Sequence, residues 1–565
     1  MDDTFHSEPI DLEHGPRERV DDRAPIDVGP ENSSTGWIAQ ATLGFVALGV
    51  LLRATRYLLN FPFWCDETML AANFLDRGYA DLFRPLDYRQ VSPLLFLGIE
   101  LTAVKLLGFS ELSLRLFPAL CGVASVPLFW QVARRLFRGV PLLLAVAIFA
   151  VSGWPLRFAA EVKPYASDLF VALGLTALAI EWRKAPSKVG WLWVLAATGP
   201  VGVALSLPAV FTVGAVGLAL LVPVWRSARR QARVAFVLYG GLSIATFSSL
   251  LRFYKTAPQD HDYFHNAWAY AFPPLSSVWR FIVWFLDIHT GFMFAYPDGG
   301  RSGASALTFL AVVATIAVLW RRGSRTVFVL LLAPFGLALV AAALHRYPYG
   351  VHARTMQYAA PVTCLLAGLG AAVLLRLVGS PLMRRRLLYG LTAGLAALGV
   401  ARLGSDLTHP YKFATDERAR SFARWFWTEL SRDGELACAG RDLGVVFEPK
   451  HWTEDATDTY LCYQKIFSPR HRSGAKLDLG KVSAARPLRC VFFNETPGDD
   501  PSFQAWFAEM LTRYDLSNLR TFPVSSIERK RGPTWDQLYV VYEFVPKPHA
   551  AESVAKRPDE ELRRR

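Results

Sequence analysis

Long apolar runs separated by short basic loops constrain this chain more than any other feature. A helix needs about 20 mostly apolar residues to cross the hydrocarbon core of a bilayer. Hydrophobic residues make up 52% of the chain and charged residues 19%, whereas a soluble domain is about a quarter charged. The pattern therefore predicts an α-helical polytopic membrane protein. We expect about 11 crossings, at 37–56, 112–137, 140–157, 166–182, 191–205, 207–225, 234–251, 304–320, 326–344, 357–377 and 387–404.

The basic residues predict how the chain is oriented. A formal net charge of +13 would suit a nucleic-acid-binding protein, but Arg and Lys gather in the loops between apolar runs, as in cytoplasmic loops. The basic loops all fall on the cytoplasmic side only if the run 92–107 lies as a helix on the outer surface. The alternative is that this run and the next form a hairpin of two crossings. We expect a multi-pass protein of the bacterial inner (plasma) membrane, with a cytoplasmic N-terminus, an extracytoplasmic C-terminal domain and no nucleic-acid partner.

Four regions follow from the composition along the chain. Residues 1–36, which are polar and acidic, are expected to form a disordered cytoplasmic tail rather than a signal peptide. Residues 37–405 form the membrane domain, 406–547 an extracytoplasmic α/β domain that we expect to bind the acceptor, and 548–565 a disordered charged tail. Within 406–547 we expect helices at 416–430 and 502–514, and strands at 436–439, 489–494 and 537–544.

The cysteines give a weaker indication. Their spacing does not match a zinc site. Two of Cys438, Cys462 and Cys490 could pair if the C-terminal domain lies outside the cytoplasm, and the sequence leaves open which two.

Two adjacent carboxylates, Asp66 and Glu67, follow the first apolar run on the expected outer face. Such a pair can act as a general base, bind a metal or hold a sugar hydroxyl. The alternative is a helix start, in which Asp66 opens a helix and Glu67 lies near its positive end.

Three further polar groups are expected on the same face, where ionisable residues are costly and mark functional sites. Arginine can bind phosphate in a bidentate manner, although lipid headgroups or an ordinary loop would also explain these residues. Aromatic residues beside acids in 252–303, such as Trp268 near Asp260, suit either carbohydrate binding or an aromatic belt. The three groups are Arg89 and Gln90; Arg157, Glu161, Lys163, Tyr165 and Asp168; and Arg346, His352, Arg354 and Tyr358.

Motifs for ATP-driven transport or membrane metalloproteolysis are absent from the sequence: it has no GxxxxGK[ST], HExxH, GxSxG or strand-linked GxGxxG. Five other motifs occur in a fixed order. They are an aromatic residue and then Asp66-Glu67; 90–96 (Gln-Val-Ser-Pro-Leu-Leu-Phe); 108–120 (Gly-Phe-Ser-Glu-Leu-Ser-Leu-Arg-Leu-Phe-Pro-Ala-Leu); 161–165 (Glu-Val-Lys-Pro-Tyr); and Arg346-Tyr-Pro-Tyr-Gly350 with Arg354, Tyr358 and Pro361.

In order and spacing, these motifs resemble the GT-C superfamily of membrane glycosyltransferases over roughly residues 40–400. The nearest likeness is to its bacterial branch of protein-mannosyltransferase-like and aminoarabinose-transferase-like proteins, similar to glycosyltransferase family 39. The resemblance implies a polyprenyl-phosphate or polyprenyl-diphosphate sugar donor, a protein, lipid or glycan acceptor outside the cytoplasm, and inversion at the anomeric carbon. The family often has Lys-Pro-Pro where this chain has Val91-Ser92-Pro93, so its usual phosphate-binding lysine is missing.

The same resemblance implies roles for individual residues. Asp66 matches the general base, and Glu67 would position it or bind the sugar. No metal ligand is assigned. Whether the protein uses a divalent metal stays open, because some relatives use one. The alternative functions are a transporter or flippase, or a non-catalytic assembly protein, for polyprenyl-linked glycans. Candidates for the donor phosphate are Arg89, Lys163, Arg346 and Arg354, and candidates for substrate binding are Gln90, Glu161, Tyr165, His352 and Tyr358.

Overall fold

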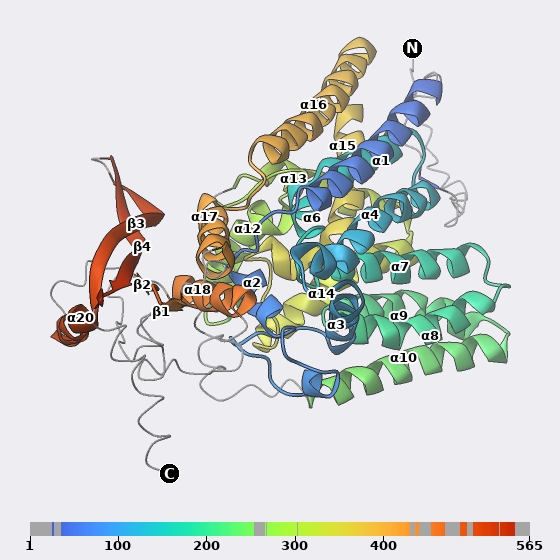
Figure 1. Cartoon of the computed structure of the whole chain (residues 1–565). Coiled ribbons are helices and arrows are strands. Elements are labelled where there is room, and N and C mark those ends of the chain that lie inside the picture. The colour runs from blue at the N-terminus through green and yellow to red at the C-terminus, as the bar shows by residue number, and fades with distance from the viewer. Residues whose placement is uncertain are drawn as a thin grey trace, which may run out of the picture.

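The computed structural model (Figure 1) joins a large helical domain to a smaller domain with a β-sheet. The expected tails at 1–36 and 548–565 lie almost wholly outside the described residues. These residues are 25–26, 35–252, 266, 268–301, 303–429, 436–439, 454–468, 486–493, 501–529 and 532–548.

Each segment expected to cross the membrane contains a helix. Among the described residues, eight helices are long and apolar enough to span a bilayer by length and composition, and Gly139–Val151 and Gly190–Leu205 are shorter apolar helices. The polytopic helical architecture is therefore confirmed, while the number of crossings and their direction stay predictions. The helices found in the expected segments, one in each, are α1 (Thr35–Leu58), α4 (Glu111–Leu136), α5 (Gly139–Val151), α7 (Tyr165–Lys184), α8 (Gly190–Leu205), α9 (Ala209–Arg226), α10 (Arg230–Leu251), α13 (Ala306–Arg322), α14 (Arg325–Ala343), α15 (Ala360–Arg376) and α16 (Pro381–Thr408).

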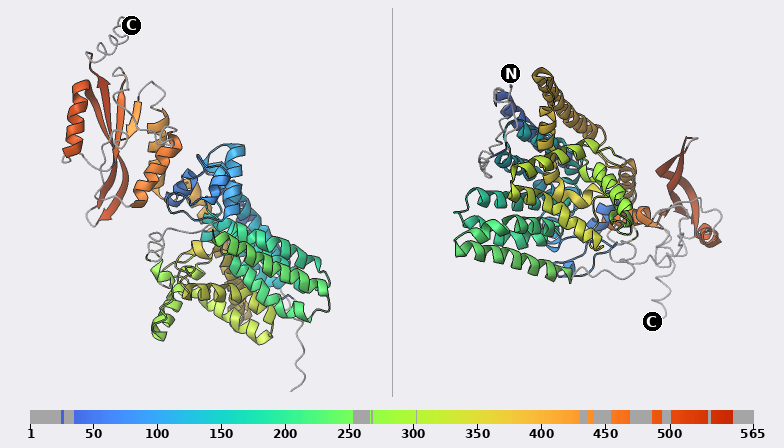
Figure 2. Two further views of the ribbon diagram at one scale, coloured as in Figure 1. Left: turned by 90° about the horizontal axis from the view of Figure 1, so that it is seen from below. Right: turned by 180° about the vertical axis from the view of Figure 1, so that it is seen from behind.

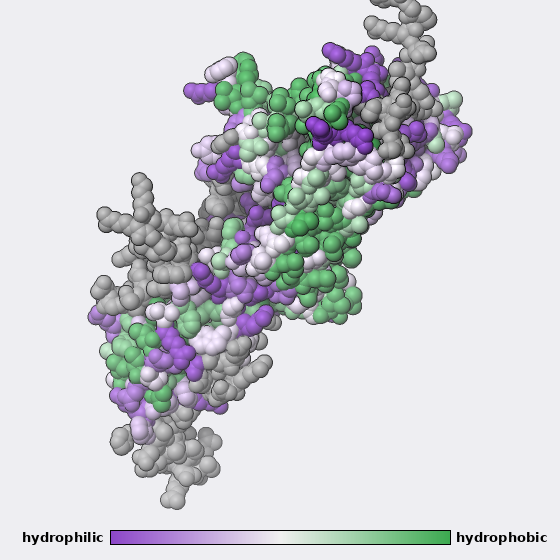
Figure 3. Space-filling model, turned by 90° about the horizontal axis from the view of Figure 1, so that it is seen from above, coloured by the Kyte–Doolittle hydropathy of each residue, from purple (hydrophilic) through white to green (hydrophobic). Residues whose placement is uncertain are grey.

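Small residues let the central helices approach closely. A Cβ at Gly368 of α15 would overlap the backbone of Ala145 in α5, and one at Gly370 would overlap the backbone of Ala311 in α13. Such contacts are typical of membrane helices, because without a hydrophobic driving force between them they associate through close packing. Many large apolar side chains of these helices are exposed, and on the face drawn in Figure 3 they form an apolar band with hydrophilic residues at its ends.

Short helices occupy several of the connections between the long helices. The run 92–107, expected as a surface helix, contains α3, and its buried Phe96, Leu97 and Leu101 belong to a separate apolar cluster from the large core of the membrane domain. The connecting helices are α2 (Cys65–Ala72), η1 (Ala80–Phe83), α3 (Leu94–Leu107), α6 (Gly153–Phe158), η2 (Ala269–Ala271), α12 (Val278–Thr290), η3 (Phe292–Phe294) and η4 (Ala353–Ala359).

The C-terminal domain contains a four-stranded sheet in the order β1-β2-β4-β3, in which β1 and β2 are parallel and the other pairs antiparallel. The three strands and two helices expected here are present, while β3 and α18 were not expected. The elements are α17 (Ala414–Arg424), the π-helical turn η5 (Trp425–Glu429), β1 (Leu436–Ala439), α18 (Glu454–Phe467), β2 (Leu488–Phe493), α20 (Pro501–Arg513), β3 (Tyr514–Arg529) and β4 (Gly532–Pro546).

Helices cover both faces of the sheet (Figure 2). Successive strand residues point to opposite faces, so Tyr542 of β4 packs with the α20 side, where it contacts Phe503. Its neighbour Val541 and also Tyr539 face α17, where Phe422 stacks on Tyr539 with ring centroids 4.1 Å apart.

The α17 side of the sheet also packs on the membrane domain. One apolar cluster joins Phe63 and Phe74, in the loop between α1 and α3 (the first loop), to Phe422, Phe426 and Tyr463 of the C-terminal domain. Burial of apolar area stabilises such a contact at about 25 cal/mol per Å². The loop that carries Asp66 and Glu67 is therefore held from both domains.

Candidate active site

Asp66 and Arg354 form the part of the site that is open to solvent. Asp66 is the second residue of α2, and Arg354 lies in η4, 288 residues away. The Nη1 of Arg354 donates to Asp66 Oδ2 at 2.7 Å, and the two side chains are 29% and 26% exposed. The guanidinium also lies 5.1 Å from the ring centroid of Trp268, which restricts its orientation further.

Glu67 has a different environment from its neighbour, since it is only 1% exposed. Its Oε1 accepts from Arg115 Nε at 2.9 Å and its Oε2 from Arg115 Nη2 at 2.6 Å. The backbone N–H of Val162 donates to the same carboxylate at 2.7 Å. A buried carboxylate with these three bonds joins α4, α2 and the loop before α7, so its geometry suits positioning rather than contact with a substrate.

Arg115 completes this junction with its remaining donors. Its Nη1 donates to the carbonyl of Phe61, and its Nη2 to that of Pro62 at 3.2 Å. Arginine has five donors in a fixed plane, so one side chain holds both the start of the first loop and the carboxylate at its helix. Asp66, next to Glu67, is thereby fixed in position.

Lys163 and Gln90 lie beside the Asp66 pair. The Lys163 Nζ donates to Gln90 Oε1 at 2.5 Å, and the lysine is buried. Burial and the Arg354 guanidinium lower the pKa of Lys163, whereas the Asp66 carboxylate raises it. The charges of Asp66 and Arg354 thus act on Lys163 in opposite directions.

Glu161 lies between two cations. Its Oε1 is 3.3 Å from Arg157 Nε and 3.4 Å from Lys412 Nζ. Burial raises the pKa of Glu161 to about 7, with a further contribution from the Glu67 carboxylate. The Arg157 and Arg56 guanidinium groups lower this pKa.

The C-terminal region supplies residues that sequence reasoning missed. Lys412 lies between α16 and α17, and its Nζ is 2.8 Å from the ring centroid of Trp64. Asp416 of α17 is buried, and burial followed by the Glu67 carboxylate raises its pKa to about 8. Both residues stand in an ordinary polar stretch, so no local pattern distinguishes them.

Two further bonds fasten the C-terminal domain to the first loop. Arg420 of α17 donates to the carbonyl of Asn60 at 3.0 Å and lies 3.3 Å from Glu111 Oε1. The hydroxyl of Tyr463 donates to the carbonyl of Phe63 at 2.8 Å.

Several predicted residues lie at the edge of this arrangement or away from it. Arg89 is exposed, in a turn where its φ is +52°, and Arg346 is also exposed. His352 is half-buried beside Trp268, and burial together with Arg354 lowers its pKa.

Two predicted tyrosines pack mainly against aromatic rings. Tyr358 is buried against Phe211 with ring centroids 5.4 Å apart, inside the membrane domain. Tyr165 packs edge-on against Phe158 at 4.8 Å. Asp260 lies outside the described residues.

The carboxylates do not gather around a common point for a metal. Within the part of the chain that the structure describes, no three His, Cys, Asp or Glu side chains are arranged to hold an ion. Asp66 faces Arg354 and Glu67 faces Arg115.

Comparison with known proteins adds the fold. No family model matches the chain, and no curated protein matches it by sequence. Among solved structures, it is similar to ArnT from Cupriavidus metallidurans bound to undecaprenyl phosphate, with a TM-score of 0.50, 13% identity, and coverage of 90% of this chain and 98% of that one. The archaeal oligosaccharyltransferase AglB from Archaeoglobus fulgidus, in complex with an inhibitory peptide and a dolichol-phosphate, gives a TM-score of 0.44 at 10% identity, covering 80% and 69%. The likeness to ArnT shows that the chain shares the overall fold of that protein.

Proposed function

We propose that this protein is an inverting glycosyltransferase of the bacterial inner membrane. It transfers a sugar from a polyprenyl-phosphate or polyprenyl-diphosphate donor to an acceptor on the extracytoplasmic face. The observation that carries the proposal is the different environment of the two adjacent carboxylates. Asp66 is open to solvent and paired with Arg354, whereas Glu67 is buried and fully bonded. The similar ArnT structure has undecaprenyl phosphate bound, which supports a polyprenyl-phosphate ligand here.

In this proposal, Asp66 accepts the proton of the acceptor hydroxyl. The hydroxyl oxygen attacks the anomeric carbon from the side opposite the phosphate, and the bond from that carbon to the phosphate oxygen breaks. The electron pair leaves with the phosphate, so the configuration at the sugar is inverted. General-base catalysis of this kind contributes about 10²–10⁴-fold.

Arg354 and Lys163 stabilise the charge on the departing phosphate. Arg354 uses Nη1 for Asp66, and its planar guanidinium has further donors for phosphate oxygens. Lys163 lies close by, on Gln90. Cations fixed in place before the reaction stabilise developing negative charge without reorganisation. Here Lys163 takes the role of the lysine that the Lys-Pro-Pro motif would supply.

The test is a profile of polyprenyl-phosphate sugars and surface glycans. It compares the native host, a deletion strain, and deletion strains expressing Asp66→Asn or Asp76→Asn at matched levels. Asp76 is an exposed acid in the same loop, so Asp76→Asn is the matched control. We expect a donor lipid to accumulate and one glycan to lose a sugar in the deletion and Asp66→Asn strains, with a native profile for Asp76→Asn. A native profile for Asp66→Asn would refute the role of Asp66 and favour transport or assembly.

A further inference from the structure

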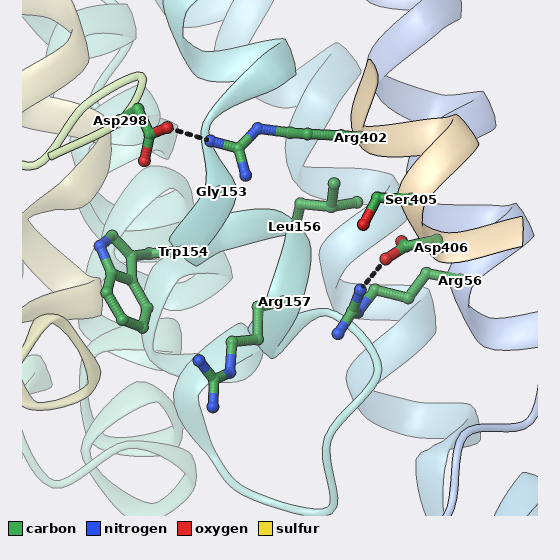
Figure 4. Close-up of a pocket in the computed structure, with 9 residues that line it drawn as sticks. All are labelled: Arg56, Gly153, Trp154, Leu156, Arg157, Asp298, Arg402, Ser405 and Asp406. Carbon is green, nitrogen blue, oxygen red and sulfur yellow. Dashed lines mark hydrogen bonds and ion pairs between the residues drawn. The ribbon is translucent and has the colours of Figure 1, made fainter. Parts of the chain in front are cut away.

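A pocket separate from the Asp66 pair lies where α1, α6 and α16 meet the loop around Asp298 (Figure 4). Its volume is about 220 Å³, whereas one water occupies about 30 Å³ in the liquid. Of the polar residues singled out in the sequence, Arg157 lines the pocket, and its Nε lies 3.3 Å from Glu161 Oε1. The pocket therefore belongs to the same face of the protein as the candidate active site.

Three guanidinium groups line this pocket, each from a different helix: Arg56 from α1, Arg157 from α6 and Arg402 from α16. Three side chains that each remain charged at all physiological pH values repel one another across so small a volume. Three positive charges around one pocket are unfavourable unless carboxylates or a bound anion offset them.

The acidic partners offset this charge only in part. Asp406 pairs with Arg56 at 2.5 Å, while Asp298 lies 3.5 Å from Arg402 and is 70% exposed, so solvent screens that pair. The third carboxylate, Glu161, is shared between Arg157 and Lys412. The lining of the pocket itself therefore holds three arginines and two aspartates.

Donors on Arg402 remain unused. Its Nη2 donates to the carbonyl of Pro297 at 3.3 Å, but its buried Nε has no hydrogen-bond partner in the described part of the protein. A buried donor without a partner costs about 1–3 kcal/mol. Gly153 leaves room for this guanidinium, since a Cβ at that position would overlap it.

From these observations we infer that the pocket binds a phosphate ester. Phosphate oxygens accept bidentate bonds from guanidinium groups, and an anion in the pocket would offset the charge of the three arginines that line it. The pocket also lies at the ends of α1 and α16, two helices of the membrane domain, where a lipid phosphate or a soluble phosphorylated compound can enter. The inference does not depend on the proposed transfer reaction.

The test is calorimetric titration of the purified full-length protein in neutral detergent. The probes are dioctanoyl phosphatidic acid, which carries a lipid phosphate, and inorganic phosphate, with dioctanoylglycerol as a phosphate-free control. We compare the native protein with Arg402→Gln and Ser405→Asp. Ser405 lines the pocket and is exposed, so Ser405→Asp adds a repulsive charge without removing a packed side chain. Arg84→Gln is the matched control, because Arg84 is an exposed arginine of the first loop, 77% accessible.

We expect at least one phosphate probe to bind to the native protein. Arg402→Gln should weaken this binding by about tenfold or more, because it removes one charge-assisted bond. Ser405→Asp should weaken it by a similar factor, because the added carboxylate repels the phosphate. Arg84→Gln should bind like the native protein. Binding of phosphatidic acid alone identifies a lipid headgroup, and binding of both probes identifies the phosphate itself. Absence of binding to the native protein, or equal binding by native protein and Ser405→Asp, would overturn the inference even if Arg402→Gln fails to fold.

Discussion

The buried pair between Glu67 and Arg115 offers the sharpest test of how the candidate active site is held. Both side chains are 2% exposed, and the pair joins α2 to α4. The substitution Glu67→Gln keeps the size of the side chain and an oxygen that can accept from Val162, but it removes the charge. Arg115 is then left as a buried cation without its carboxylate.

The expected cost is large. Removal of one partner from a buried ion pair typically destabilises a protein by about 3–5 kcal/mol, because the remaining charge is buried without compensation. If the loop 61–72 and the segment 158–165 open locally, a cost of about 3 kcal/mol corresponds to a more than hundredfold larger open population. Replacement of both partners by apolar residues should recover much of this loss, since well-packed apolar substitutes are often neutral.

Hydrogen exchange monitored by mass spectrometry measures this opening directly. We expect peptides covering 61–72 and 158–165 to exchange at least about a hundredfold faster in Glu67→Gln, and to return toward the native rate in the double variant Glu67→Met with Arg115→Met. Arg84→Gln breaks an exposed pair with Asp81 and should change exchange little, since exposed pairs contribute about 0–1 kcal/mol. Native exchange of both segments in Glu67→Gln would show that the pair does not hold the loop.

Three further predictions follow from the C-terminal region. Burial raises the pKa of Asp416 from 3.8 to about 8, so between these two pH values the folded state holds a proton that the unfolded state has lost. The free energy of unfolding should therefore fall as pH rises through this range. Asp416→Asn should flatten the pH dependence of the thermal unfolding midpoint, and an unchanged slope would contradict this. Cys438 and Cys490 lie side by side on β1 and β2 with sulfurs 3.1 Å apart, so mild oxidation should join them in a disulfide detectable by peptide mass mapping, whereas a bond of either to Cys462 would contradict the sheet register. Lys412→Gln should leave Glu161 with one cation, lower the unfolding midpoint and lower transfer activity, and native values for both would exclude a supporting role for Lys412.

The apolar runs predict the helices well because a bilayer imposes one requirement, a sufficiently long apolar segment, that is written locally in the chain. The missed strand β3 shows where local patterns fail. It spans Tyr514–Arg529, contains Pro523 and many polar residues, and lies at the edge of the sheet. Edge strands tolerate proline and polar side chains because one side of their backbone is unpaired, so the usual alternation of apolar residues is lost.

The sequence was sufficient to predict where in the chain the site residues lie, but not which contacts they make. Adjacent carboxylates after the first apolar run indicate Asp66 and Glu67, yet nothing local separates their environments. Glu67 is buried by Arg115, 48 residues away, and Asp66 is paired with Arg354, 288 residues away. Only the packing of helices distant in sequence assigns one carboxylate to the interior and leaves the other open.

The contacts of the C-terminal domain also change how its role must be tested. Deletion of residues 406–565 would remove Lys412 and Tyr463 from the loop that carries Asp66, and it would expose the apolar cluster around Phe63. Lost activity after such a deletion would therefore follow from a displaced loop as readily as from lost acceptor binding. A point variant far from the junction separates the two. Arg520 lies on the edge strand β3 with a side chain 47% exposed and 3.2 Å from Glu543, so Arg520→Gln removes one exposed charge without placing two carboxylates together. If that variant lowers acceptor use without changing exchange in 61–72, the sheet binds the acceptor; if exposed sheet variants leave acceptor use unchanged, the domain acts through the loop that it holds.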